Sequence, residues 1–386
     1  MRLSFAIGWA FAYGPAAITE PAMSSRPTPQ PGILTIAPYQ PGKSKAVPGV
    51  TPVKLSANES PLGASPKALA AMRLAIETPE IYPEGSSRIL REALGEVHGL
   101  DPDRIVCGNG SDDLLHLLAQ VYLGQGDQAV MSRHGFSVYP IVTMAASAEI
   151  VMAPETDYRA DIDALLAAVT ERTRILFLAN PNNPTGTCLS AKDLDRLHRG
   201  LRPDILFVLD SAYAEYVTSA DYTAGIELVD RAENVVMVRT FSKMGLAAAR
   251  IGWMYGPEHV VDAVNRIRGP FNVNLSAQFG GAAAVRDTEF TARLNAYNAH
   301  WRDWLTRALG SNAIRVLPSE ANFVLALFPD PQTAAAAFQA LLAEGLIVRE
   351  IGVYGIPDGL RISIGPENAM RRLVEVLKPF GAPGAE

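Results

Sequence analysis

Short apolar segments alternate with amphipathic segments along most of this chain, and the alternation predicts a mainly parallel β-sheet. The amphipathic segments 161–169 and 190–198 carry apolar residues at helical spacing. Strands that alternate with helices form parallel sheets whose two faces are both covered by helices. The apolar segments of strand length are 129–131, 149–152, 174–178, 205–209 and 235–238.

The pattern changes after residue 272. A long helical segment at about 277–309 leads to a smaller unit in which strands and helices are mixed. We therefore predict a large α/β domain at 58–272, with a mostly parallel sheet, and a smaller α+β domain at 273–386. The strands expected in the small domain are 322–327, 347–349 and 360–364, and its helices are 333–344 and 366–377.

Two segments precede the large domain. Residues 1–22 contain a short apolar run that resembles a weak signal peptide, but glycines interrupt it and no clean cleavage site follows. We interpret it as a leader or upstream extension, with Met23 as the natural start. Residues 23–57 are rich in proline, which prevents regular structure and predicts an extended arm.

Composition excludes several classes of function. The 386 residues are 48% hydrophobic and 19% charged, and their net charge of -6 comes without a basic cluster, so no nucleic-acid partner is expected. No apolar run approaches the roughly 20 residues of a membrane span. The two cysteines fit a reducing cytoplasm, and the six histidines show no metal-binding spacing. We expect a soluble cytoplasmic protein without a metal site.

Four polar residues follow the ends of separate predicted strands. They are Ser111, Asn183, Asp210 and Lys243. Because ligands bind at the carboxyl ends of parallel strands, we expect the four side chains to converge on one site. Lys243 alone would be interpreted as a solvated surface lysine. Held at a strand end, its neutral amine can attack an aldehyde to form a Schiff base.

A candidate anion site lies at Gly110, Ser111 and Asp112. A strand, a glycine-rich turn and a helix follow one another here, so backbone amides at the helix start could bind a phosphate. Ser111 could equally serve only as a helix cap. The turn lacks the third glycine of the dinucleotide-binding fingerprint, and no acidic residue follows at the expected distance.

An aromatic cofactor with a phosphate and an aldehyde would use all four of the residues that follow strand ends. Ser242 and Arg250 would join Ser111 at the phosphate, and Asp210 would pair with a ring nitrogen. The remaining roles are hydrogen bonds from Asn183 and Tyr213 to a ring hydroxyl, stacking of Phe136 on one face, and covalent attachment at Lys243.

Several motifs, in this order and at these intervals, resemble the class I/II aminotransferases, which use pyridoxal 5'-phosphate on fold type I. The likeness covers about residues 26–378, and a further group of motifs narrows it to the histidinol-phosphate aminotransferase branch. The motifs of the class are NPNNPTG, LDSAYAEY and TFSKMGLAAARIGW, and those of the branch are NESPLG, IYPEG, GNGSDD, ANFVL and VREIGVYGIPDGLRISIG.

This resemblance implies a seven-stranded, mostly parallel sheet, a homodimer and amino transfer between histidinol phosphate, or imidazole-acetol phosphate, and glutamate or 2-oxoglutarate. It implies that Tyr82 reaches the cofactor phosphate of the neighbouring subunit. It also implies that Asn58 and Asn183 contact the substrate, and that Arg349 and Arg361 hold its anionic group. The expected catalytic residues are Lys243, Asp210 and Tyr213.

One interval departs from the family pattern. Eight positions normally separate the lysine from the arginine, and here Arg250 follows Lys243 after seven. Either a tighter turn still brings Arg250 to the phosphate, which we favour, or the arginine is displaced. The alternatives that remain open are an aminotransferase for aromatic amino acids, a pyridoxal-phosphate decarboxylase acting on phosphothreonine, and a non-catalytic regulatory homologue.

Overall fold

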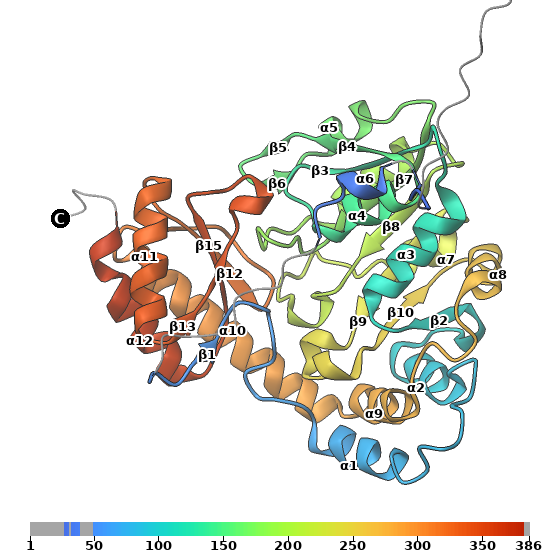
Figure 1. The fold of residues 1–386 in the computed structure, drawn as a ribbon, viewed down its shortest axis with the longest axis horizontal. Coiled ribbons are helices and arrows are strands. Elements are labelled where there is room, and N and C mark those ends of the chain that lie inside the picture. The colour runs from blue at the N-terminus through green and yellow to red at the C-terminus, as the bar shows by residue number, and fades with distance from the viewer. Residues whose placement is uncertain (1–26, 31, 39–48, 382–386) are drawn as a thin grey trace, which may run out of the picture.

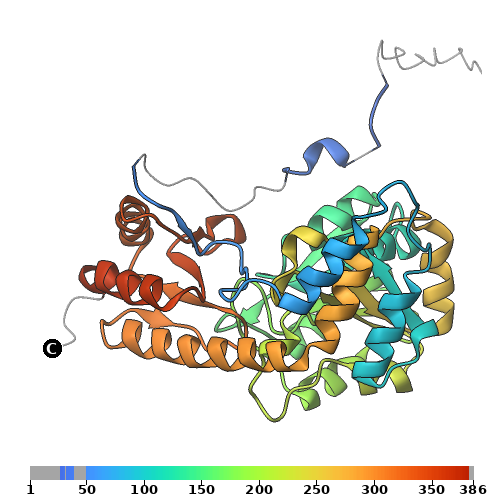
Figure 2. The same cartoon turned by 90° about the horizontal axis from the view of Figure 1, so that it is seen from below.

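A computed structural model describes residues 27–30, 32–38 and 49–381, so the predicted leader and Met23 lie outside the described residues. A large unit and a smaller one lie side by side, and the long helix α10 (Thr288–Gly310) runs along the smaller unit from their junction. Figure 1 shows the large unit in colours from the blue α1 through cyan, green and yellow to the orange α9, and the small unit mainly in orange and red. Figure 2 shows α10 extending beneath the small unit.

The large unit is built on the predicted seven-stranded sheet. Its strands lie in the order β2-β10-β9-β8-β7-β3-β4, and all neighbours are parallel except β10, which is antiparallel to both β2 and β9. The expectation of a mostly parallel seven-stranded sheet is confirmed. The strands are β2 (Ile105–Gly108), β3 (Gln128–Ser132), β4 (Glu149–Ala153), β7 (Thr173–Ala179), β8 (Leu206–Asp210), β9 (Val235–Thr240) and β10 (Gly252–Tyr255).

Helices cover both faces of this sheet, which explains why its central strands are apolar along most of their length rather than alternating. Every residue of β8 and β9 is buried. The first face packs against α1 (Pro66–Ala75), α2 (Arg88–His98), α5 (Ile162–Ala167), α6 (Ala191–Gly200), α7 (Ile226–Arg231) and α9 (Leu275–Arg286). The second face packs against α3 (Ser111–Tyr122), α4 (Val138–Ala145) and α8 (Glu258–Ile267).

Local capping fixes where several helices begin. The Ser65 hydroxyl accepts hydrogen bonds from the amides of Lys67 and Ala68, with Pro66 in the first turn of α1. Ser190 and Asp193 form a reciprocal capping box at the start of α6.

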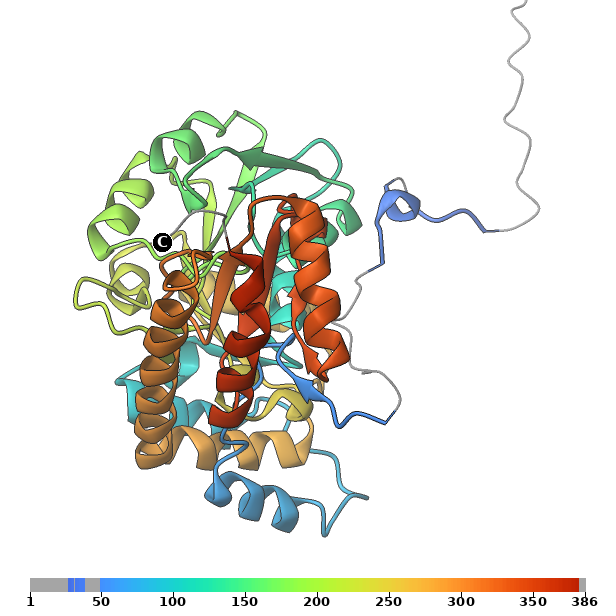
Figure 3. The ribbon, with the colours of Figure 1, turned by 90° about the vertical axis from the view of Figure 1, so that its left-hand side faces the viewer.

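The small unit contains a four-stranded antiparallel sheet in the order β11-β12-β15-β14, together with a two-stranded parallel sheet of β1 and β13. The strand predicted at 347–349 is wrong as a single element, because it divides between β13 and β14 in different sheets. In Figure 3, β1 lies beside the small unit although it precedes the large one in sequence. The elements are β1 (Val53–Lys54), β11 (Arg315–Val316), β12 (Phe323–Leu327), β13 (Leu346–Ile347), β14 (Arg349–Glu350), β15 (Gly359–Ser363), α11 (Pro331–Ala343) and α12 (Glu367–Leu377), and a separate hairpin joins β5 (Glu155–Thr156) and β6 (Arg159–Ala160).

The helical segment predicted at 277–309 is two helices, α9 and α10, that meet at Asp287. The Asp287 carboxylate accepts a hydrogen bond from Ser65 and pairs with Lys67 at 3.1 Å, which ties the junction to the start of α1. Residues of α9 belong to the core beneath the large sheet, whereas Leu305 and Leu309 of α10 belong to the core of the small unit. The domain division at 272/273 stays a prediction.

Candidate active site

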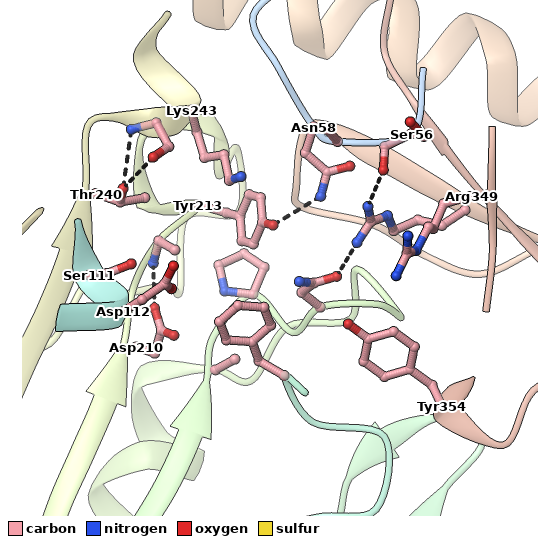
Figure 4. A pocket seen from close by; sticks show the side chains of 18 of the residues that line it. Ser56, Asn58, Ser111, Asp112, Asp210, Tyr213, Thr240, Lys243, Arg349 and Tyr354 are labelled. Atoms are coloured by element: carbon pink, nitrogen blue, oxygen red, sulfur yellow. Dashed lines mark hydrogen bonds between the residues drawn. The ribbon is translucent and has the colours of Figure 1, made fainter. Parts of the chain in front are cut away.

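A cavity of about 220 Å³ lies between the carboxyl ends of the central strands and the small unit. Twelve of the residues expected in the site line it, and Figure 4 shows many of them from close by. Its lining residues are Lys54, Ser56, Ala57, Asn58, Ser111, Asp112, Phe136, Ala179, Pro181, Asn183, Asp210, Ala212, Tyr213, Thr240, Ser242, Lys243, Arg250, Arg349, Tyr354 and Arg361. The polar residues after four separate strands therefore share one cavity.

Lys243 stands just beyond β9, in a short 3-10 turn at Ser242–Met244. Its ammonium nitrogen lies 5.8 Å from the centre of the Tyr213 ring. Burial, followed by the positive charge of Arg361, lowers the pKa of Lys243 to about 8. Near neutral pH, a proton on this amine can therefore be exchanged at low cost, as a nucleophile or general base requires.

Asp210 is the last residue of β8 and is buried. The hydroxyl of Tyr139 donates a hydrogen bond to its Oδ2 at 2.9 Å, and the amide of Ala212 donates to Oδ1 at 3.2 Å. Burial raises the pKa of Asp210 to about 6, and the two hydrogen bonds oppose that rise. A cation placed in the cavity beside Asp210 would offset the cost of burying its charge.

The sequence did not point to Tyr139. It lies at the start of α4, and its ring stacks on Phe177 with centroids 4.9 Å apart. The rings of Tyr139 and Phe136 are nearly perpendicular, with centroids 5.8 Å apart. Tyr139 thus connects the aromatic residue at the cavity wall with the carboxylate at the strand end. The only feature of the sequence that could have indicated Tyr139 is its position three residues after Phe136, and that spacing alone does not predict a role in the site.

The start of α3 provides exposed backbone amides at the cavity. Its N-cap is Gly110, with φ 91°, and no side chain caps the helix among the described residues. A Cβ on Gly110 would lie 2.4 Å from Nη2 of Arg250, so the guanidinium lies against the bare backbone of this glycine. Helix amides, the Ser111 hydroxyl and a guanidinium together form a site suited to an anion such as a phosphate.

The shortened interval before Arg250 is accommodated by tight backbone turns. Two 3-10 turns, Ser242–Met244 and Ala247–Ala249, flank Gly245, which has φ 88°, and Arg250 itself has φ 55°. The Arg250 guanidinium lies 3.4 Å from the Ser242 hydroxyl and 3.4 Å from the Asp112 carboxylate. The guanidinium of Arg250 therefore lies beside the first residues of α3. This position matches the alternative of a tighter turn after Lys243 rather than that of a displaced arginine.

Asn58 connects the two units across the cavity. Its side chain donates to the hydroxyl of Tyr213 at 3.0 Å and accepts from Ser363 at 2.9 Å, and its carbonyl accepts from Asn322 at 2.9 Å. Burial raises the pKa of Tyr213, so its phenol stays protonated at neutral pH. The dashed line between Asn58 and Tyr213 in Figure 4 marks the first of these bonds.

The small unit contributes cations to the opposite wall. Arg361 is buried on β15 and donates to the Oδ1 of Asn183 at 2.6 Å and to the carbonyl of Ser56 at 2.7 Å. Arg349 on β14 is the strand partner of Arg361 and lines the same cavity. Lys54, Thr240 and Tyr354 also line it and were missed from the sequence. Lys54 lies on β1, which pairs with the distant β13, whereas Thr240 is the last residue of β9 and Tyr354 lies in a 3-10 turn at Gly352–Tyr354.

Tyr82 does not line the cavity. Its side chain is 77% exposed and stacks on Phe271 with ring centroids 4.6 Å apart. The resemblance assigned Tyr82 to the site of a neighbouring subunit, and that role stays a prediction. Within the part of the chain that the structure describes, no group of three or more potential metal ligands is found, and no helix is long and apolar enough to span a membrane.

The model of the family "Aminotransferase class I and II" matches residues 50–377. This chain belongs to that family. Its members transfer an amino group between an amino donor and a 2-oxo acid, which agrees with a cavity that contains a lysine of lowered pKa and several cations.

Within this family, the chain is similar to several proteins that are named histidinol-phosphate aminotransferases. The histidinol-phosphate aminotransferase of Nitrobacter hamburgensis is 53% identical over 363 residues, which is 93% of this chain and 99% of that protein. That of Rhodopseudomonas palustris strain TIE-1 is 53% identical over 92% of this chain and 99% of its own length. The crystal structure of the Sinorhizobium meliloti histidinol-phosphate aminotransferase in complex with pyridoxal-5'-phosphate superimposes with a TM-score of 0.85 at 28% identity, covering 93% of this chain and 98% of that one.

Proposed function

We propose that this aminotransferase uses pyridoxal 5'-phosphate to move an amino group between histidinol phosphate, or imidazole-acetol phosphate, and glutamate or 2-oxoglutarate. This reaction belongs to histidine biosynthesis. The observation that carries the proposal is the 53% identity to a histidinol-phosphate aminotransferase over 93% of this chain and 99% of that relative.

The residues of the cavity fit the cofactor. The uncapped start of α3 and the Arg250 guanidinium against Gly110 suit its phosphate, with Ser111 and Ser242 beside them. The buried Asp210 suits a protonated ring nitrogen, because a cation there would offset the cost of burying the carboxylate. Tyr213, Asn183 and Phe136 line the space where the ring hydroxyl and one ring face would lie.

When bound, the cofactor supplies an aldehyde for covalent capture of the amino group and a ring that withdraws electrons from the substrate's α-carbon. Lys243 is assigned the covalent attachment and, once released by the amino donor, the removal of the proton from the donor's α-carbon. A pKa of about 8 allows its amine to be deprotonated near physiological pH. Asp210 would keep the positive charge on the ring. Tyr213 and Asn183 would hydrogen-bond the ring hydroxyl, with Asn58 holding the Tyr213 hydroxyl.

Arg349 and Arg361 are assigned to the anionic group of the substrate. Arg361 is held by Asn183 and by the Ser56 carbonyl, so its guanidinium is fixed before a ligand arrives. A fixed guanidinium binds a carboxylate or phosphate with less loss of side-chain entropy. The positions of both arginines in the small unit support a reaction in which anionic substrates enter between the two units.

We also propose that the protein is a homodimer in the cytoplasm. A group of exposed apolar side chains gathers around α1, α9 and the segment between α1 and α2, and a surface of this kind is typical of a protein–protein interface. Tyr82 belongs to this group, which supports its assignment to the partner's site. The exposed residues are Leu69, Leu74, Ile76, Ile81, Tyr82, Phe271 and Phe279.

A panel of amino donors tests this function. Purified protein loaded with pyridoxal 5'-phosphate is supplied with 2-oxoglutarate and with histidinol phosphate, phenylalanine, tyrosine or phosphothreonine, and glutamate and carbon dioxide are measured. We expect the highest kcat/KM for glutamate formation with histidinol phosphate. A preference for phenylalanine or tyrosine would indicate an aromatic aminotransferase. Release of carbon dioxide from phosphothreonine would indicate a decarboxylase, and the absence of product with every donor would indicate a regulatory homologue.

A further inference from the structure

The chain segment around β1 presents alternate residues to the cavity and to the core. Leu55 is buried in the core of the small unit, whereas its neighbours Lys54 and Ser56 both line the cavity. This alternation is that of an extended strand, in which residues two apart point to the same side. β1 pairs with β13 so that Lys54 is opposite Ile347, two residues before Arg349. The pairing therefore places a lysine on the cavity wall that carries the substrate arginines.

The cations on this wall differ in how firmly they are held. Arg361 is buried, and its bonds to Asn183 and to the Ser56 carbonyl fix it. The Lys54 ammonium lies 2.7 Å from the Glu59 carboxylate, in a pair whose side chains are 37% and 44% exposed. Exposed ion pairs of this kind contribute little to stability. Lys54 can therefore exchange or share its partner with an incoming anion at small cost.

The charges along the cavity favour a dianion at this wall. The acidic residues among those lining the cavity are Asp112 and Asp210, and Figure 4 shows both on the side away from Arg349 and Ser56. Asp112 lies beside Arg250, and Asp210 accepts from Tyr139. A carboxylate carries one charge and is satisfied by one guanidinium fork, whereas a phosphate monoester carries close to two charges and three acceptor oxygens.

We propose that Lys54 determines specificity by binding the phosphate of the phosphorylated amino donor together with Arg349 and Arg361, while the 2-oxo acid uses the arginines without Lys54. This inference rests on the proposed function and adds a residue to it. Lys54 donates from a flexible side chain and so adapts to the larger anion, and Glu59 neutralises it when the smaller anion is bound.

The experiment compares substrates with and without the phosphate. Wild type and Lys54→Gln, each loaded with cofactor, are assayed with histidinol phosphate and with histidinol, and the KM of the oxo-acid acceptor is measured separately. For the variant we expect kcat/KM with histidinol phosphate to fall about tenfold or more, since a hydrogen bond to a charged group is lost. With histidinol, and for the KM of the oxo-acid acceptor, we expect changes within about threefold, because neither substrate meets Lys54.

Two further variants separate binding of the phosphate from a general effect of removing a lysine. Lys54→Arg keeps the charge and should retain most of the preference for the phosphorylated donor. Lys378→Gln removes a lysine from a comparable exposed pair with Glu375, neither of which lines the cavity, and should leave all constants unchanged. An equal loss with both donors, or no loss with either, overturns the role of Lys54. Failure of wild type to use histidinol phosphate at all instead overturns the proposed function, and the role of Lys54 with it.

Discussion

The hydroxyl of Tyr139 donates to Oδ2 of Asp210 at 2.9 Å, so a phenol on one helix holds the carboxylate at the end of a central strand. Tyr139→Phe removes this donor and should raise the pKa of Asp210 further above about 6. Pyridoxal 5'-phosphate should then bind more weakly at pH 6 than in wild type, and the difference should shrink as the pH rises and Asp210 ionises. Cofactor titration from pH 5.5 to 8.5 measures this, and a loss independent of pH would contradict it.

Replacing Lys243 by alanine should lower kcat by at least about 10³-fold, because the covalent attachment and the general base are both lost. The visible absorbance of the covalently attached cofactor should also disappear. Lys192→Ala, at an exposed position on α6, is the matched control and should retain both properties. Turnover and absorbance close to wild type in Lys243→Ala would remove this lysine from the mechanism.

The lowered pKa of Lys243 also predicts how stability depends on pH. The folded protein without cofactor releases this proton at about pH 8, and the unfolded chain keeps it until about 10.5. The unfolded state therefore binds more protons between these values, and the free energy of unfolding contributed by Lys243 rises with pH across that window. Below pH 8 the buried charge reduces stability.

Lys243→Met should accordingly be more stable than wild type at pH 7, by about 1–3 kcal/mol, and the advantage should vanish near pH 10.5. Urea unfolding of both cofactor-free proteins at pH 7 and pH 10 checks the sign. An advantage for the variant that grew with pH would show that Lys243 is not destabilised by its surroundings.

A side chain at Gly110 should weaken cofactor binding. Gly110→Ala would place a Cβ 2.4 Å from Nη2 of Arg250 and would impose a strained left-handed φ of 91° on alanine. We expect the dissociation constant for pyridoxal 5'-phosphate to rise by about 10-fold or more, since a hydrogen bond from a charged group to the phosphate is disturbed. Gly310→Ala, at the end of α10 with no atom within 4 Å of the new Cβ, should leave the constant unchanged.

The proposed dimer makes a prediction about Tyr82 that activity measurements on mixed subunits can test. If Tyr82 of one subunit completes the site of the other, mixing subunits of Tyr82→Ala and Lys243→Ala should restore activity, because each mixed dimer then has one site with neither substitution. We expect up to about a quarter of wild-type activity from random mixing, while each variant by itself stays low. No gain on mixing, with mixed dimers demonstrated by mass spectrometry, would contradict shared sites.

The sequence was sufficient for the parallel strands of the large sheet and for the four polar residues that follow strand ends in the cavity, for a physical reason. Parallel strands are buried on both faces, so they stand out as apolar runs, and their carboxyl ends converge on one edge. Ser111, Asn183, Asp210 and Lys243 could be gathered in this way without a structure. Their chemical roles were argued from the cofactor chemistry that they suit and from the resemblance, and the mutations of Lys243 and Tyr139 above test those of Lys243 and Asp210.

Long-range pairing was harder to predict. Lys54 reaches the cavity because β1 pairs with β13, almost 300 positions later in the chain, and no local pattern encodes that pairing. Tyr139 meets Asp210 across 71 positions. The strand predicted at 347–349 was wrong because its apolar pattern continues across Val348, which separates β13 from β14, and these two strands join different sheets.

A single cycle of amino transfer tests the central claim most directly. Cofactor-loaded protein is incubated with histidinol phosphate in the absence of an acceptor, freed from the donor by gel filtration, and then given 2-oxoglutarate. We predict that each active site releases one glutamate, and that Lys243→Ala releases none. Absence of glutamate from the wild-type protein, with histidinol phosphate bound but unchanged, would contradict the proposed amino transfer.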